Sequence, residues 1–221
     1  TTYTDVAGYY SLEGLEPGSH LIGTQSRKGW VPTFPDNAGA LTEVPMFHVV
    51  DTTVFDRPIL DDLCELTTLV RTVAKSPEGG RQLQQLASTK RAMLYFTQPS
   101  TRTFLSMNNA CHILGIRTSE IRNAAVSSEV KGETFEDSIR TFSSYVDLIV
   151  MRTPDPGYAA RAAALMDSIP RPVPIVNAGS GKDQHPTQAL LDAYTIRQRK
   201  KLAKLKVAIV GDILHSRVAR S

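Results

Sequence analysis

The chain has 221 residues, 41% of them hydrophobic, and its 25 Lys and Arg residues barely exceed its 22 Asp and Glu residues. That length fits one or two globular domains, and the balanced charge argues against a nucleic-acid-binding protein, which usually carries a clustered basic face. No apolar run approaches the roughly 20 residues of a membrane-spanning helix, so we expect neither a nucleic-acid partner nor a membrane partner.

Residues 1–45 differ in character from the rest of the chain. They are rich in Gly, Pro, Thr and aromatic residues, and the short runs 9–12 and 20–23 alternate on either side of the turn signal Glu16–Gly18. We therefore predict a β-rich segment, which resembles part of a prealbumin-like β-sandwich repeat of exported surface proteins. A plain N-terminal extension is the alternative.

Strands and helices alternate from Met46 onward. The predicted strands cover residues 47–50, 92–96, 148–151, 173–176 and 207–210. The predicted helices cover residues 56–74, with Asp56 as the cap and Pro58 in the first turn, and then 103–114, 134–145, 158–169 and 185–199. This order predicts an α/β fold with parallel sheets covered by helices on both faces. Ligands of such sheets lie beyond the carboxyl ends of the strands.

The segment Pro99–Thr103 is the most informative part of the sequence. It joins a buried strand to the N-terminus of the next helix, where backbone N–H groups are unpaired and the helix dipole is positive. The hydroxyls of Ser100, Thr101 and Thr103 add hydrogen-bond donors, and Arg102 adds a planar guanidinium that suits phosphate. We predict a phosphate cradle. The alternative is that Ser100 or Thr101 only caps the helix.

Two further polar positions lie beside predicted elements. Arg152 ends the strand 148–151, so we expect its charge in the ligand crevice; a solvated surface arginine is the alternative. His185 begins a helix with Pro186 in the first helical position, and the helix dipole disfavours its protonated form. A neutral imidazole can still donate a hydrogen bond to a carbonyl oxygen, although a simple cap is the alternative. Gln188 lies on the same helix face and can address the same small substrate.

Three segments, in this order, resemble the aspartate/ornithine carbamoyltransferase family. They are Pro99–Thr103, Ser127–Thr134 and Asn177–Gln188, and the resemblance covers about residues 46–221. It implies carbamoyl phosphate and an amino acid as substrates, without a metal or organic cofactor.

The resemblance also implies an organisation into domains, with two parallel-sheet α/β domains of which the second is truncated. The expected parts are a β-rich extension or partial repeat at 1–45, a carbamoyl phosphate-binding domain at 46–185, a linking helix at 186–199 and the start of an aspartate-binding domain at 200–221. Because the chain begins at Thr1 rather than Met and stops at Ser221 inside a predicted strand-to-helix turn, we expect a fragment.

The resemblance assigns roles to individual residues. The residues expected to bind carbamoyl phosphate are Ser100, Thr101, Arg102, Thr103, Arg152, His185 and Gln188. Those expected to take part in catalysis are His185, Arg102, Thr103, Arg152 and Gln188. In this scheme Arg102 neutralises the leaving phosphate, and Thr103 and Arg152 reach the carbonyl oxygen, which His185 and Gln188 polarise.

The resemblance also places residues of one subunit in the site of another. Ser127 and Lys131 are expected to enter the active site of the neighbouring subunit, which implies a homotrimer with shared sites. Lys131 and Arg217 are expected to bind aspartate. Arg217, which follows Asp212 after the last predicted strand, suits a dicarboxylate because guanidinium grips a carboxylate by two bonds. With Gln184, it favours aspartate over ornithine.

Two positions depart from the family pattern. Phe104 stands where the family usually has a second arginine, and Thr153 stands where it usually has histidine. Phe104 removes a charge beside the phosphate cradle, so we expect it to change either the affinity for phosphate or the local packing of the helix. Thr153 is expected to change only the support around Arg152.

The expected function is transfer of the carbamoyl group from carbamoyl phosphate to L-aspartate, in de novo pyrimidine biosynthesis, with this chain inactive alone. The alternatives are a carbamoyltransferase for ornithine or another amine, and a catalytically dead paralogue that only joins a trimer. Cys64 and Cys111 make no disulfide framework, and we expect Cys111 to be a small core residue. A reducing cytoplasm is the expected compartment.

Overall fold

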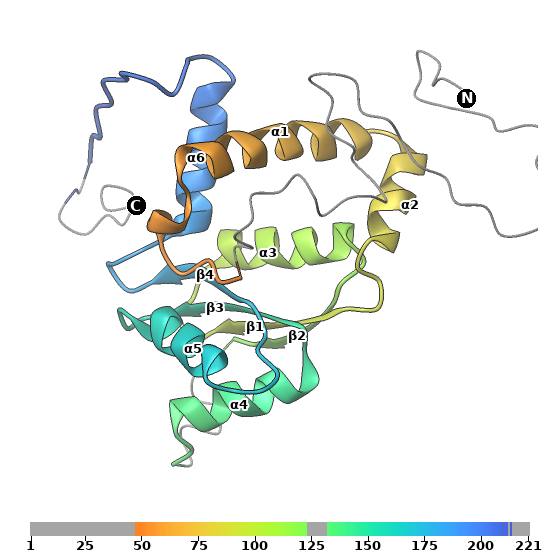
Figure 1. Ribbon diagram of the computed structural model, residues 1–221, viewed down its shortest axis with the longest axis vertical. Coiled ribbons are helices and arrows are strands. Elements are labelled where there is room, and N and C mark those ends of the chain that lie inside the picture. Colours follow the sequence, from red (N-terminus) through yellow and green to blue (C-terminus); the bar gives the residue numbers. More distant parts are fainter. Residues whose placement is uncertain (1–46, 123–131, 212, 214–221) are drawn as a thin grey trace, which may run out of the picture. The chain divides into compact units, whose positions relative to one another are not determined.

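The computed structural model describes residues 47–122, 132–211 and 213, all of which belong to the unit Met46–Ser221. Helices and strands alternate along this part of the chain (Figure 1). Their bounds are η1 Thr52–Val54, α1 Arg57–Val73, α2 Pro77–Gln85, β1 Arg91–Phe96, α3 Thr101–Ile113, β2 Arg117–Ile121, α4 Phe135–Tyr145, β3 Leu148–Thr153, α5 Tyr158–Asp167, β4 Ile175–Ser180 and α6 Pro186–Arg197. The predictions made for residues 1–45, Ser127, Lys131, Asp212 and Arg217 lie outside the described residues.

The strands form one four-stranded sheet in the order β2-β1-β3-β4, and every neighbouring pair is parallel. Helices α4 and α5 cover one face, and α3 lies against the other face, with α1, α2 and α6 on the same side (Figure 1). Parallel strands are joined by helical crossovers, which pack back on the sheet and bury both of its faces. The predicted α/β fold with helices on both faces of a parallel sheet is therefore confirmed.

Successive side chains of β1 enter two separate cores, because neighbouring residues of a strand point to opposite faces. Met93 and Tyr95 pack with residues of α4 and α5 in one core. Leu94 and Phe96 pack with α3 in the other. The strand is consequently buried on both sides, which explains why the sequence shows a continuous apolar run there rather than an alternation.

The Leu94 core should carry a large share of the stability. Leu94 is 0% exposed and Leu86 is 47% exposed, so the same truncation can be compared at a buried and a surface site. We expect Leu94→Ala to lower the free energy of unfolding by about 2–5 kcal/mol, since it leaves a cavity. The control Leu86→Ala should change it by no more than about 0.5 kcal/mol. Equilibrium urea unfolding measures both, and equal losses would contradict this assignment of the core.

The predicted helix starts follow from local capping. The Asp56 carboxylate accepts a hydrogen bond from the Ile59 N–H at 2.9 Å, which confirms Asp56 as the cap of α1. The hydroxyl of Thr134 accepts from the Asp137 N–H at 3.2 Å at the start of α4. Each cap satisfies a backbone donor that the first turn leaves unpaired. The third helix begins at Thr101, two residues before the predicted start.

Two predicted strands are wrong. At residues 47–50 only Val49 forms a bridge, parallel to Val176, and it exchanges two backbone hydrogen bonds of 2.8 Å with that strand. Residues 207–210 form no strand, and Val207 and Val210 are 64% and 95% exposed. A strand needs a partner along its length, and among the described residues this segment has none.

Neither α2 nor β2 was predicted from the sequence. β2 lies at the edge of the sheet and has no fully buried residue, so its sequence lacks the apolar run that marks the inner strands. α2 is short and polar, with Ser76 as its cap. Within the described residues, no helix is both long enough and apolar enough to cross a membrane.

Both cysteines are buried free thiols. Cys111 lies on the inner face of α3, which confirms it as a core residue. Burial raises the pKa of its thiol, because the low-dielectric core disfavours the thiolate. Since the thiolate is the reactive form, we infer that Cys111 is chemically inert in the folded chain.

Candidate functional site

The connection from β1 to α3 presents small polar groups at the carboxyl edge of the sheet. Ser100 is the N-cap residue of α3, with extended backbone (φ −164°, ψ 105°), but its side chain makes no capping hydrogen bond. Thr101, Arg102 and Thr103 form the first turn, where the helix leaves backbone N–H groups unpaired. The hydroxyl of Ser100 is therefore not used as a cap, and the arrangement suits an anion.

Arg152 links this connection to the next two strands. It lies opposite Phe96 in the sheet register and is only 7% exposed, which excludes a solvated surface arginine. Its carbonyl oxygen accepts hydrogen bonds from the backbone N–H groups of Thr97 at 3.0 Å and Gln98 at 3.2 Å. Its Nη1 donates to the carbonyl oxygen of Ala178 at 3.1 Å. One buried residue thus ties the ends of β1, β3 and β4 together.

The end of β4 is held by side-chain hydrogen bonds and a glycine. The Asn177 amide donates to the Val50 carbonyl oxygen at 2.8 Å. Gly181 has a positive φ of 46°, and its N–H donates to the Thr153 carbonyl oxygen at 2.9 Å. A Cβ atom at Gly181 would lie 2.5 Å from the Pro154 carbonyl oxygen, so only glycine fits this crossing. The loop that leads to α6 is consequently fixed against β3.

His185 follows this loop as the N-cap residue of α6, but its side chain makes no capping hydrogen bond. Its Nδ1 atom lies 3.2 Å from the hydroxyl oxygen of Thr187. When that hydroxyl donates to Nδ1, the ring proton of a neutral imidazole resides on Nε2. His185 can then donate from Nε2 to a carbonyl oxygen, which is the electrophilic role predicted for it.

Gln188 lies one turn further along α6 and is half-buried. Its Nε2 atom donates to the Asp192 carboxylate at 3.0 Å, so the side chain follows the helix axis. A primary amide has a second N–H and a carbonyl oxygen, which stay usable by a ligand.

The direction of α6 is set by its contacts with α1. The Tyr194 hydroxyl lies 3.1 Å from the Thr68 hydroxyl and accepts from Arg71 at 3.2 Å. These two hydrogen bonds hold the pKa of Tyr194 below its ordinary value, because they stabilise the phenolate. Arg197 pairs with Glu65 at 3.2 Å. The helix that presents His185 is thereby anchored at its far end.

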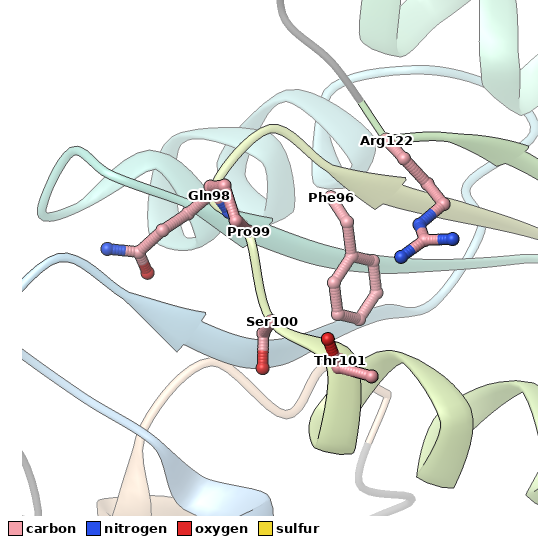
Figure 2. Close-up of a pocket in the computed structure, with 6 residues that line it drawn as sticks. All are labelled: Phe96, Gln98, Pro99, Ser100, Thr101 and Arg122. Carbon is pink, nitrogen blue, oxygen red and sulfur yellow. The ribbon is translucent and has the colours of Figure 1, made fainter.

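A cavity of about 210 Å³ opens beside the start of α3. Figure 2 shows its lining, which comprises Phe96, Gln98, Pro99, Ser100, Thr101 and Arg122. Ser100 and Thr101 were predicted as phosphate-binding residues. Arg122 and Gln98 were not, and the sequence gives no signal for Arg122 because β2, the strand that it follows, has no apolar run.

The two departures from the family pattern have structural roles. Phe104 is 5% exposed and packs edge-on against Phe96, with ring centroids 5.4 Å apart, so it belongs to the core under α3. Thr153 is 2% exposed, and its hydroxyl donates to the Asp155 carbonyl oxygen at 3.1 Å. Phe104 thus packs α3 against the sheet, and Thr153 supports the turn after β3.

The structure gathers part of the predicted site at one edge of the sheet. The ends of β1, β3 and β4, and with them the Ser100–Thr103 turn and Arg152, are joined by the hydrogen bonds described above. His185 follows β4 after the short loop 181–184, which is held against the strand end because the Ser180 N–H donates to the Gln184 carbonyl oxygen at 3.0 Å. Among the described residues, no group of three or more His, Cys, Asp or Glu side chains could hold a metal ion.

Residues 48–198 match the family model described as "Aspartate/ornithine carbamoyltransferase, carbamoyl-P binding domain". "Aspartate carbamoyltransferase 3, chloroplastic" of Pisum sativum is 38% identical, and the alignment covers 100% of this chain and 54% of that protein. The aspartate carbamoyltransferase catalytic subunit of Methanoculleus marisnigri is 39% identical over 80% of this chain and 55% of its own length. The chain therefore spans about half the length of the curated relatives it matches.

Solved structures of aspartate transcarbamoylases are also similar to this chain. The aspartate transcarbamoylase of Trypanosoma cruzi, in complex with carbamoyl phosphate and aspartate, superposes with a TM-score of 0.69. It is 31% identical to this chain, and the match covers 78% of this chain and 51% of that one.

Proposed function

The chain belongs to the aspartate/ornithine carbamoyltransferase family, and we propose that it forms the carbamoyl phosphate-binding part of an enzyme that carbamoylates L-aspartate. The observation that carries this proposal is the joining of the Ser100–Thr103 turn, Arg152 and the loop before His185 at one edge of a parallel sheet. The relatives named aspartate carbamoyltransferase, and the Trypanosoma cruzi structure with carbamoyl phosphate and aspartate, support the choice of substrates.

The proposed phosphate site is the first turn of α3. Ser100, Thr101 and Thr103 offer hydroxyl and backbone N–H donors, and Arg102 offers a guanidinium, to the phosphate oxygens. Binding there would orient carbamoyl phosphate without a metal ion, because the helix dipole and the arginine supply the positive charge.

The proposed carbonyl site lies between Arg152 and His185. The amine nitrogen of aspartate attacks the carbamoyl carbon, the C–N bond forms, and negative charge grows on the carbonyl oxygen. Donors fixed in place before the reaction stabilise that charge more than they stabilise the ground state. The C–O bond to phosphate then breaks, and phosphate leaves with the electron pair. The attacking nitrogen, which became positively charged on forming the C–N bond, loses one proton to the departing phosphate and is neutral in the product. The products are N-carbamoyl-L-aspartate and phosphate. Gln188 would support the same oxygen and the incoming amine.

The partners and the surroundings of the enzyme are part of the same proposal. Ser127 and Lys131 would enter a neighbouring subunit's site in a homotrimer, and Lys131 and Arg217 would bind aspartate. The division into a carbamoyl phosphate-binding domain at 46–185 and a following aspartate-binding domain also stays a prediction. We propose de novo pyrimidine biosynthesis as its pathway and the cytoplasm as its location, where two buried free thiols would stay reduced.

The full-length protein should produce N-carbamoyl-L-aspartate from carbamoyl phosphate and L-aspartate, and L-ornithine should be a poor acceptor. Product formation with each acceptor in turn, measured as carbamoylated amino acid and released phosphate, tests this. Ornithine turnover exceeding aspartate turnover would move the assignment to the other branch of the family. Phosphate binding without turnover of any amine would support a catalytically dead paralogue.

A protein of residues 1–221 alone should bind phosphate weakly and form no N-carbamoyl-L-aspartate. It spans about half the length of its relatives, and Val207 and Val210 are exposed in a segment that pairs with no strand among the described residues. Such apolar exposure favours association between chains. Turnover assays combined with light scattering measure both properties. An active, well-behaved trimer of this chain would overturn the prediction.

A further inference from the structure

Resting on the proposed function, we propose that Arg122 is an additional phosphate-binding residue of this site, held in place by the ring of Phe104. Neither the family resemblance nor the motif Pro99–Thr103 points to Arg122. The inference comes from the cavity beside α3, which Arg122 lines together with Ser100 and Thr101 (Figure 2).

The backbone brings Arg122 to this cavity through the register of the sheet. β2 pairs with β1 in parallel, and Ile121 lies opposite Tyr95. The next residues, Arg122 and Phe96, therefore lie side by side at the carboxyl edge, where α/β sheets bind their ligands. The chain runs from Phe96 through residues 97–99 to Ser100 and Thr101. The ends of the two strands therefore place Arg122 and the two hydroxyl residues around the same cavity.

The side chain of Arg122 is held by an aromatic ring. Its Cζ atom lies 4.2 Å from the centroid of Phe104, within the distance of a cation–π contact. Phe104 is itself fixed, since it is 5% exposed and packs edge-on against Phe96 at 89°. A cation–π contact uses the charge of the guanidinium and none of its N–H groups as hydrogen-bond donors. The contact with Phe104 therefore holds the arginine and leaves its donors for an anion.

The charge of Arg122 is open to an anion. Among the described residues, no carboxylate forms an ion pair with it. In the view of Figure 2 the Arg122 guanidinium and the Thr101 hydroxyl lie on either side of the Phe96 ring, and all three residues line the cavity. A phosphate dianion matches that combination of a positive fork, hydroxyl donors and a helix N-terminus.

This arrangement explains how a chain with phenylalanine at position 104 can still bind phosphate. The family usually has an arginine at position 104. In this chain Arg122, the residue after β2, supplies a positive charge instead, and its guanidinium lies over the Phe104 ring. The pair Phe104 and Arg122 acts as one unit, so the two positions should be coupled in phosphate binding.

The test is the affinity of the full-length protein for inorganic phosphate and for carbamoyl phosphate, measured by titration calorimetry. Arg122→Ala and Arg122→Gln should each raise both dissociation constants about tenfold, the loss expected for one charge-assisted contact. Phe104→Leu keeps the site apolar but removes the ring, and it should weaken binding about threefold. Arg117→Ala removes an exposed arginine from the opposite end of β2 and should change neither constant.

Kinetics separate this role from a structural one. In the two Arg122 variants the KM for carbamoyl phosphate should rise while the KM for L-aspartate and the unfolding midpoint stay at the wild-type values. The double variant Phe104→Leu with Arg122→Ala should bind no more weakly than Arg122→Ala alone, because the ring acts only through the arginine.

Two outcomes distinguish this inference from the proposed function. If Arg102→Ala weakens phosphate binding but both Arg122 variants bind like wild type, the inference about Arg122 is wrong and the proposed function stands. If the wild-type protein binds neither phosphate nor carbamoyl phosphate, the proposed function itself fails.

Discussion

Replacing His185 with alanine in the full-length protein should lower kcat by about 10²–10³-fold, the loss typical of one donor to a developing oxyanion. The ring lies at the N-cap of α6 without capping it, and its Nδ1 contacts the Thr187 hydroxyl at 3.2 Å. When the Thr187 hydroxyl donates to Nδ1, the proton of the neutral ring is on Nε2, which can donate to the carbonyl oxygen. Because the hydrogen bond strengthens as charge builds on the carbonyl oxygen, binding of carbamoyl phosphate should change much less than kcat.

Steady-state kinetics and a separate binding titration check the His185 prediction. His112→Ala is the matched control, since it removes an exposed histidine from the far end of α3. It should keep wild-type kinetics. Thr187→Val should lower kcat less than His185→Ala, because it removes only the contact that orients the ring. A His185→Ala enzyme with full kcat would show that this histidine merely occupies the start of the helix.

Replacing Arg102 with alanine should weaken carbamoyl phosphate binding by about 10- to 150-fold, which corresponds to about 1.5–3 kcal/mol for one hydrogen-bonded charge. Arg102 is the second residue of α3, which the connection 97–100 joins to the buried strand β1, and it is exposed to solvent. Its charge adds to the positive end of the helix dipole. We also expect a strong fall in kcat, since the leaving phosphate gains charge in the transition state.

Two variants make the Arg102 prediction specific. Arg102→Lys should restore part of the affinity, because it keeps the charge but loses the planar fork. Arg81→Ala, which removes an exposed arginine of α2 paired with Glu78 at 2.5 Å, should bind carbamoyl phosphate like wild type. Equal affinities of Arg102→Ala and wild type would remove the basis for a phosphate site at the start of α3.

The inner elements of the fold are predictable because their burial shows as a pattern of apolar residues within a short stretch of sequence. A run such as residues 92–96 is apolar throughout, which marks a strand covered on both faces. Asp56 and Thr134 mark helix starts through hydrogen bonds made within three residues. These signals depend only on neighbours in the chain, so they survive without knowledge of the tertiary structure.

The errors occur where a partner far away in the chain decides the outcome. Residues 207–210 are apolar and look like a strand, but no described strand pairs with them. Edge strand β2 shows the reverse case: its residues carry weak strand signals, yet pairing with β1 makes it a strand. A strand is stabilised by its neighbour's hydrogen bonds, which local sequence cannot reveal.

The sequence by itself determined the family, the order of the inner strands and helices, and the polar residues that follow them. Only the tertiary structure decided that Arg152 is buried and joins three strand ends. It alone decided that Arg122 lies over Phe104 at the cavity beside Ser100. These arrangements depend on strand register and on contacts between residues far apart in the chain. Such long-range contacts leave no pattern within a short stretch of sequence.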